Sequence, residues 1–194
     1  MFSRRPSIPR FRHALALAGL VALGLNLSAA ASEAIDATTA DVYPRLKTTD
    51  HFLKADLAAA TRTLDYAMSL LGSPYKRGGS DPKTGTDCSG FVRHVYQHSN
   101  GIPLPHNAAQ MSERGEPVKQ EGLLPGDLVF FNTLRRPFSH VGIYVGNGEF
   151  VHAASSRNRR VMVSRLDERY WRERYDGARR LDQADRMGRL RLNK

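Results

Sequence analysis

The stretch Thr86-Asp87-Cys88-Ser89-Gly90-Phe91-Val92-Arg93-His94-Val95-Tyr96 contains the only cysteine of this 194-residue chain. The run before it, residues 78–85, is rich in Gly and Pro and therefore predicts a loop. After the cysteine, apolar residues recur at three- and four-residue spacing, which predicts a helix with one buried face that ends near Ser99. Asp87 is a preferred N-cap residue, so Cys88 is expected at the first helical position.

Two interpretations of this cysteine are open. The unpaired N–H groups and the positive dipole end of a helix N-terminus favour a thiolate at Cys88, which would make the sulfur nucleophilic. A lone cysteine is more often a small, buried, chemically inert residue. Its cellular compartment and its possible partners in the chain decide between the two.

Residues 1–31 have the pattern of a secretory signal peptide. Four arginines and no acidic residue precede an apolar segment over residues 14–27, and Ala29-Ala30-Ala31 offers a cleavage site. The apolar segment is short for a membrane span, so an uncleaved anchor is the weaker alternative and no stable anchor is expected after cleavage. The pair Arg4-Arg5 leaves twin-arginine export open beside the ordinary secretory route. We therefore expect export, to the periplasm.

Export changes the interpretation of Cys88. Exported proteins meet oxidising surroundings, where cysteines are usually paired in disulfides, and a single cysteine has no internal partner. A reactive nucleophile becomes the leading interpretation. The formal charge is +10, and +6 without the signal peptide, which suits an anionic cell-wall polymer or lipid. No groove-reading helix or stacking platform is visible, so nucleic acid is not expected as a partner.

The remaining chain predicts helices followed by antiparallel strands, which is an α+β fold of one domain. Residues 32–56 form a polar, flexible lead-in, and residues 183–194 form a mobile basic tail. A helix is predicted over residues 56–71, with a buried face comprising Leu57, Ala60, Leu64, Ala67, Met68 and Leu71. A short helix is predicted over residues 107–114, strands over 128–131, 139–145, 149–153, 161–163 and 175–181, and an irregular or helical turn over 166–171.

The hairpin over residues 139–153 carries His140 and His152 on opposite arms, and its register decides whether they meet. A two-residue Asn147-Gly148 turn would place the two histidines on opposite faces of the sheet. A three-residue loop over residues 146–148 would set Gly142 opposite His152, so that the histidines become diagonal neighbours on one face. It would also gather five apolar side chains on the other face, and we therefore predict the longer loop.

One thiol at a helix N-terminus and two imidazoles on one sheet face indicate nucleophilic catalysis by cysteine. Such catalysis requires a base near the thiol and a third polar group that orients the base. The alternatives are hydrogen-bonded structural histidines or a Cys/His/His zinc site. The zinc site lacks both a fourth ligand and a close Cys-x-x-Cys spacing. We therefore expect no metal and no cofactor.

Several of these segments together resemble the NlpC-type cell-wall peptidases, which are papain-like cysteine hydrolases. The resemblance covers residues 57–181, within an expected catalytic domain over residues 57–182, and is closest to the single-domain murein D,D-endopeptidase branch. It is carried by Gly78-Gly79, by residues 87–92, by Pro125-Gly126-Asp127-Leu128, and by residues 140–144 and 150–153. The implied fold packs N-terminal helices on an antiparallel β-meander, with the nucleophile at a helix N-terminus.

The resemblance implies a role for each matching residue. Cys88 would be the nucleophile, His140 the general base and His152 the group that orients His140. Tyr75 and the backbone N–H of Cys88 would bind the oxyanion, while Ser89 and Asp87 would support the site. His106 stands where many relatives carry Arg. His94 and His98 are interpreted as exposed helix residues, and His51 and His106 receive no role.

The implied substrate is peptidoglycan, cut at the D-alanyl–diaminopimelate cross-link. Alternatives are the γ-D-glutamyl–diaminopimelate bond, acyl transfer by the same thiol, or a catalytically silent wall-binding module that uses its basic surface. The sequence does not say whether a regulatory protein binds.

Overall fold

The computed structural model describes residues 54–155 and 158–181, which belong to one compact unit. The predicted signal peptide, the basic tail, His51 and most of the predicted lead-in lie outside these residues. Within the described part of the chain, no helix combines the length and the apolar composition that a membrane span requires.

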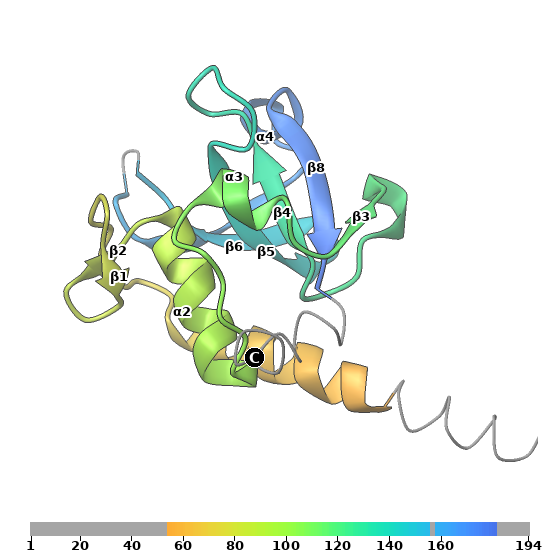
Figure 1. Cartoon of the computed structure of the whole chain (residues 1–194). Coiled ribbons are helices and arrows are strands. Elements are labelled where there is room, and N and C mark those ends of the chain that lie inside the picture. The colour runs from red at the N-terminus through yellow and green to blue at the C-terminus, as the bar shows by residue number, and fades with distance from the viewer. Residues whose placement is uncertain (1–53, 156–157, 182–194) are drawn as a thin grey trace, which may run out of the picture. The chain divides into compact units, whose positions relative to one another are not determined.

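A six-stranded antiparallel sheet carries the fold, with the strand order β3-β8-β4-β5-β6-β7 (Figure 1). The strands are β3 (Glu116–Val118), β4 (Leu128–Phe131), β5 (His140–Gly146), β6 (Glu149–Ala153), β7 (Val161–Arg165) and β8 (Tyr175–Arg180). The α+β class and the β4–β7 meander are confirmed. The last strand departs from a simple meander, because it returns to pair with β4 and brings the unpredicted strand β3 to its outer edge.

Helices account for much of the remaining described chain. Residues 54–69 are helical, and the other helices are α2 (Cys88–Asn100), α3 (Ala108–Met111), the 3-10 helix η1 (Gln120–Gly122) and α4 (Arg169–Arg172). Two short strands, β1 (Ser80–Asp81) and β2 (Gly85–Thr86), pair within the segment that was predicted as an irregular loop. Helix α3 is shorter than predicted, because the chain turns at Ser112 and reaches Gly115 at a φ of +72°.

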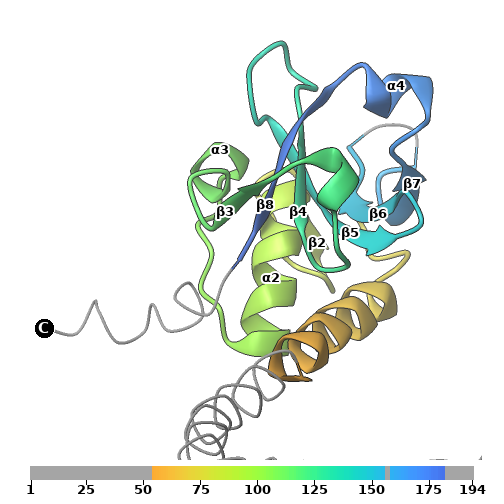
Figure 2. The same ribbon diagram turned by 90° about the vertical axis from the view of Figure 1, so that its right-hand side faces the viewer.

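Both faces of the sheet are covered, which explains the uninterrupted apolar run of β4. Leu128 and Phe130 belong to the main core, where helix α2 packs on the sheet through residues such as Phe91 and Val95 (Figure 2). The alternate residues of β4 belong to a second cluster on the other face. Its buried members are Val129, Phe131, Phe150, Leu166, Trp171 and Ala178.

The predicted buried face of the first helix is wrong in part. Leu57, Met68 and Leu71 are 69%, 40% and 43% exposed. Ala67 is buried and Leu64 partly buried, as predicted, but the other buried residues are Ala59 and Thr63. Small side chains face inward because this helix approaches the end of α2 closely enough for polar contacts: the side-chain amide of Asn100 donates to Thr63 Oγ1 at 2.6 Å and to the Ala59 carbonyl at 3.2 Å.

The first helix also has different bounds from those predicted. Lys54 and Ala55 are already helical, although they fall in the predicted flexible lead-in. At the other end, Leu70 and Leu71 form tighter turns, with N–H groups bonded three residues back to Ala67 and Met68. Gly72 then adopts a φ of +85° and ends the segment.

The hairpin of β5 and β6 has the predicted register but a different connection. Ile143 pairs with Val151, which sets Gly142 opposite His152 as predicted. The loop itself is the two-residue turn Asn147-Gly148, with φ values of 53° and 75°. The register shifts between Tyr144 and Gly146, so a bulge absorbs the extra residue. The bulge lets the hairpin combine a tight turn, which matches the twist of the strands, with the register that the apolar pattern requires.

Helix α2 is fixed at both ends as predicted. The Asp87 side chain accepts a hydrogen bond from the N–H of Gly90, and Gly101 ends the helix at a φ of 69° with its N–H bonded to the Gln97 and Tyr96 carbonyls. The Tyr96 hydroxyl donates to the Gly126 carbonyl and ties the helix to the turn before β4. In that turn Asp127 is buried and accepts two hydrogen bonds from Arg180, at 2.8 and 2.7 Å.

Gly90 tests how closely the loop over residues 78–87 packs on α2. A Cβ atom at this position would overlap the Gly79 carbonyl oxygen and lie 2.9 Å from His106 Nε2. We expect Gly90→Ala to lower the free energy of unfolding by about 2 kcal/mol, because the Gly79 backbone cannot move away without strain. Urea titration measures this. Gly122→Ala is the control, since its Cβ would meet only Val118 Cγ1 at 3.9 Å, and an equal loss in both variants would contradict the expectation.

Candidate active site

Cys88 lies at the first position of α2, on the side of the helix that faces β5. Cys88 is partly buried, and the backbone N–H of Val141, the residue that follows His140, interacts with its thiol and lowers the thiol pKa. The backbone N–H groups of Ser89 and of Cys88 itself also lower the pKa of the thiol. The helix N-terminus and the start of strand β5 therefore meet at the thiol.

The Asp87 carboxylate holds the chain around Cys88. Its Oδ1 accepts hydrogen bonds from the Gly90 N–H at 2.7 Å, the Ser89 hydroxyl at 3.0 Å and His106 Nε2 at 3.1 Å. Its Oδ2 accepts from the Gly78 N–H at 3.0 Å. The carboxylate thus holds together the preceding loop, the first turn of α2 and the side chain of His106.

Two of the other histidines have surroundings that the sequence did not predict. His106, which received no role, contacts Asp87 beside Cys88; the contact joins segments 19 residues apart, and no local pattern reports it. His94 was predicted to be exposed but is half-buried, and its Nε2 lies 3.0 Å from the Tyr66 hydroxyl of the first helix. His98 is exposed as predicted and stacks on His94, with ring centroids 3.9 Å apart.

His140 and His152 meet on one face of the hairpin, as the predicted register requires. His140 Nε2 lies 3.0 Å from His152 Nδ1, and His152 Nε2 lies 3.0 Å from Ser164 Oγ on strand β7. The histidines are 6% and 1% exposed, and Trp171 packs on both rings at centroid distances of 5.4 and 4.8 Å. A continuous, buried chain of hydrogen bonds therefore crosses three strands.

Ser164 is a site residue that the sequence prediction missed. Phe150 pairs with Ser164 and His152 pairs with Met162, so Ser164 is a diagonal neighbour of His152 across β6 and β7. The only signal is a hydroxyl residue in the apolar run 161–164, where a buried polar group needs a partner.

Tyr75 lies beside Cys88 on the segment before the loop. It forms a bridge with Thr86, and its N–H donates to the Arg159 carbonyl at 2.7 Å. Burial raises the pKa of the phenol, and the neighbouring charges of Cys88 and Asp87 raise it further. The Tyr75 hydroxyl therefore stays protonated and can donate a hydrogen bond.

Burial sets the charge state of the pair. It raises the pKa of the Cys88 thiol to about 11, with a further rise from Asp87, and this outweighs the three backbone N–H groups that lower it. Burial also lowers the pKa of His140 to about 4 and that of His152 well below its usual value, the second helped by the proximity of His140. In the unoccupied site these shifts favour the neutral thiol and the neutral imidazole, and they oppose the effect of the helix terminus, which favours a thiolate.

A cavity of about 390 Å³ opens at the paired histidines. His140 and His152 form part of its wall together with Trp171, Tyr170 and Thr133. Among residues 54–155 and 158–181, no three His, Cys, Asp or Glu side chains are grouped so that they could hold a metal ion.

A cysteine at the N-terminus of a helix that packs on an antiparallel sheet, opposite histidines on neighbouring strands, defines the papain-like class of α+β folds. The model of the NlpC/P60 family matches residues 72–180, and the chain belongs to this family.

Relatives and solved structures agree with this assignment. The chain is 43% identical over 132 residues to the gamma-DL-glutamyl hydrolase of Bacillus subtilis, covering 67% of this chain and 32% of that protein. It is 40% identical over 121 residues to the murein DD-endopeptidase MepS/murein LD-carboxypeptidase of Escherichia coli K12, covering 62% of each. The chain thus matches about one to two thirds of these relatives' lengths. An NlpC/P60 family protein from Bacillus cereus superposes with a TM-score of 0.57 at 34% identity, over 62% of this chain and 39% of that one.

The lowered pKa of His140 predicts acid sensitivity of the fold. In the unfolded chain His140 becomes protonated below pH 6.5, whereas in the folded protein it stays neutral down to about pH 4. Stability from His140 is thus complete above pH 6.5 and falls by about 3 kcal/mol toward pH 4. Urea titrations from pH 4 to 8 measure this, and His140→Asn should flatten the slope. The control His98→Asn should keep the wild-type slope; an unchanged slope in His140→Asn would contradict the assignment.

Proposed function

We propose that this domain hydrolyses amide bonds in the stem peptides of peptidoglycan, with Cys88 as nucleophile and His140 as general base. Two observations carry the proposal: the buried His140–His152–Ser164 hydrogen-bond chain, and the interaction of the Cys88 thiol with the backbone N–H of Val141, the residue that follows His140. The names of the relatives, a murein DD-endopeptidase and a gamma-DL-glutamyl hydrolase, supply the substrate class.

The mechanism starts from a neutral pair. Because His152 engages Nε2 of His140, the other ring nitrogen, Nδ1, is the one available to the thiol. Proton transfer from Cys88 to Nδ1 accompanies attack of the sulfur on the amide carbon. The tetrahedral intermediate then collapses as the His140 imidazolium protonates the leaving amine. A water molecule, deprotonated by His140, hydrolyses the thioester to the acid and restores the thiol.

The oxyanion of each tetrahedral intermediate needs preformed hydrogen-bond donors. We assign this role to the backbone N–H of Cys88 and to the Tyr75 hydroxyl, whose raised pKa keeps it a donor. Asp87 and Ser89 support these donors by fixing the first turn of α2.

The hydrogen-bond direction in the chain follows from the role of His140. If Nδ1 of His140 accepts the thiol proton, its Nε2 carries a hydrogen and donates to His152 Nδ1. His152 must then carry its hydrogen on Nε2 and donate to Ser164 Oγ. His152 thereby orients His140 and stabilises the imidazolium, and Ser164 holds His152 in the required tautomer.

The bond we propose is the D-alanyl–diaminopimelate cross-link between stems. The γ-D-glutamyl–diaminopimelate bond within one stem is a second candidate, favoured by the 43% identity with a gamma-DL-glutamyl hydrolase. We further propose that residues 1–31 are a cleaved signal peptide, that the enzyme acts in the periplasm, and that the catalytic domain spans residues 57–182.

Digestion of purified muropeptides tests the proposed activity. Wild-type protein should convert cross-linked dimers to monomers, and Cys88→Ala should lose at least about 10³-fold in rate while keeping its fold. Mass spectrometry of the products distinguishes cross-link cleavage from γ-D-glutamyl cleavage, and added amine acceptors would reveal acyl transfer. Undigested muropeptides with a folded wild-type protein would favour the silent wall-binding module.

Ser164→Ala tests the end of the histidine chain. It leaves the buried Nε2–H of His152 unpaired, at a cost of about 1–3 kcal/mol, so we expect kcat to fall about tenfold with KM unchanged. Ser164→Thr keeps the hydroxyl and should recover most of the loss. A Ser164→Ala enzyme with wild-type kcat would contradict the role.

A further inference from the structure

The loop between β4 and β5, residues 132–139, is strained yet firmly held. Arg135 and Phe138 have φ values of 56° and 49°, which side-chain-bearing residues rarely adopt. The Ser139 hydroxyl oxygen accepts hydrogen bonds from the Thr133 and Leu134 N–H groups at 2.9 and 3.1 Å. The Phe138 N–H donates to Asp176 Oδ2 at 2.7 Å. Strain that the surroundings maintain in this way is typical of binding loops, and this loop leads directly into His140.

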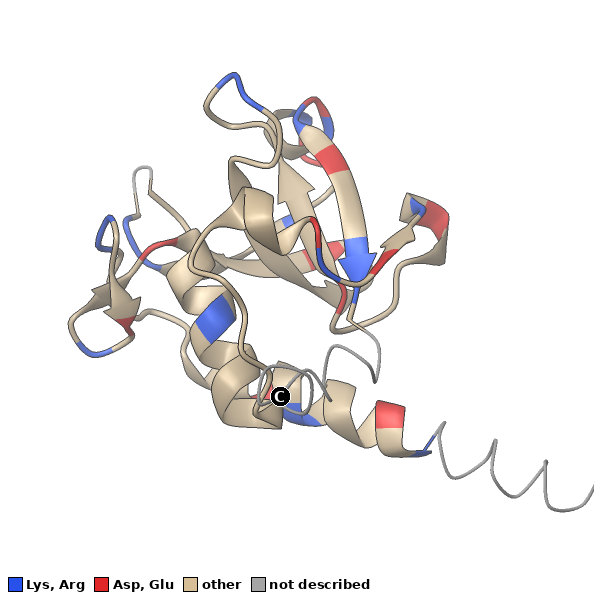
Figure 3. Cartoon of the chain, viewed as in Figure 1, with Lys and Arg blue, Asp and Glu red and all other residues tan. Residues whose placement is uncertain are grey.

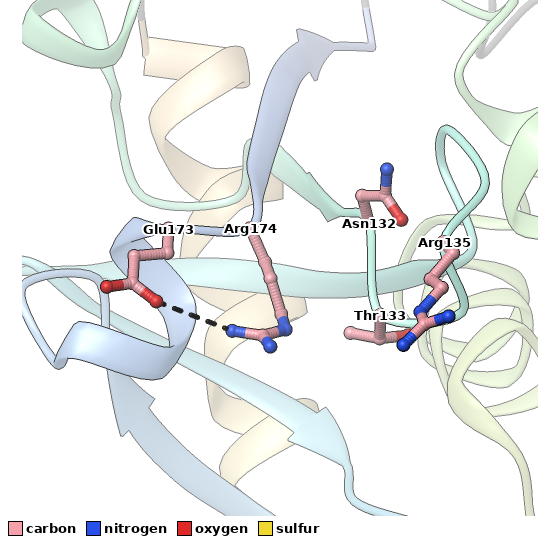
Figure 4. A pocket seen from close by; sticks show the side chains of 5 residues that line it. All are labelled: Asn132, Thr133, Arg135, Glu173 and Arg174. Atoms are coloured by element: carbon pink, nitrogen blue, oxygen red, sulfur yellow. Dashed lines mark ion pairs between the residues drawn. The ribbon is translucent and has the colours of Figure 1, made fainter.

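A second cavity, of about 510 Å³, lies beside this loop (Figure 4). Its walls are formed by Asn132, Thr133, Arg135, Glu173 and Arg174. Thr133 also lines the cavity that contains His140 and His152, so the two cavities adjoin. A substrate bound in the cavity at His140 and His152 can therefore place an adjacent residue of its peptide in the second cavity.

The second cavity has an excess of positive charge. Figure 4 shows Arg135 and Arg174 on either side of Thr133, and basic residues occupy the tip of the loop (Figure 3). Arg174 is held in place, because its guanidinium lies 4.1 Å from the Tyr170 ring centroid and donates to the Tyr170 carbonyl. Glu173 is bound more closely by Arg169, at 2.8 Å, than by Arg174, at 4.0 Å.

Two groups in the wall have unused bonding capacity. Arg135 makes no hydrogen bond or ion pair with any part of the chain that the structure describes. The side-chain oxygen of Asn132 is buried and has no hydrogen-bond partner there either. A guanidinium donates two parallel hydrogen bonds to a carboxylate. A stem-peptide residue can supply such a carboxylate.

We propose that this cavity is a subsite for a free carboxylate on a stem-peptide residue next to the cleaved bond, with Arg135 and Arg174 as its cationic partners. This inference rests on the proposed function and adds a requirement to it: the substrate must be anionic at that residue. γ-Linked glutamyl, diaminopimelyl and terminal D-alanyl residues each carry such a carboxylate. The attraction should weaken as ionic strength rises.

Matched substrates with free or amidated stem carboxylates test the subsite. We expect the wild-type KM to be about fivefold lower for the free carboxylate, and Arg135→Gln to abolish this difference with kcat unchanged. Arg135→Lys should retain part of it. Arg136→Gln is the matched control, because Arg136 is an exposed residue of the same loop outside the cavity wall. An Arg135→Gln enzyme that still discriminates like wild type would overturn the subsite.

Binding separates the subsite from the catalytic proposal. In the Cys88→Ala background, calorimetry should show tighter binding of the free-carboxylate muropeptide, and Arg135→Gln should remove that preference. Cleavage without any carboxylate preference in binding would overturn the subsite and leave the hydrolase intact. Carboxylate-dependent binding without cleavage by wild-type protein would overturn the hydrolase and leave the subsite intact.

Discussion

The pairing of Ile143 with Val151 is the constraint on which the site depends. A shift of either strand by one residue would turn its side chains over, exposing apolar residues and burying polar ones in the wrong layer. With the observed pairing, Val141, Ile143, Val151 and Ala153 all enter the main core, while both histidines meet on the opposite face. Core packing therefore also stabilises the imidazole pair, because the same register satisfies both.

Local signals in the sequence predicted the features that local chemistry controls. Asp87 as cap, Gly101 as terminator and the alternating arms of the hairpin each act within a few residues, and the structure has all of them. The bulge at the end of β5 was not predictable, because a tight turn and a longer loop give the same pairing further along the strands.

Features that depend on distant contacts were missed. The first helix turns small residues inward because Asn100 and Thr63 bond across the helix pair, a contact that periodicity within one helix does not report. Ser164 and His106 likewise acquire partners only when strands or loops far apart in the chain come together. Hydrophobic spacing identifies an amphipathic helix, but the partner selects which stripe is buried.

The electrostatics of Cys88 result from a competition between two effects of the same helix terminus. The helix end supplies N–H groups that favour a negative sulfur, but it also carries the Asp87 carboxylate that caps it and lies in a buried setting. Burial and the carboxylate prevail, and the lowered pKa of His140 shows the same exclusion of water from the other side.

The protonation state of the Cys88 thiol also determines how readily it is oxidised when no substrate is bound. Peroxides and disulfides react with thiolates, and burial, which raises the pKa of the Cys88 thiol, lowers the fraction that is ionised. The elevated pKa thus protects the single thiol of the unoccupied protein against oxidation.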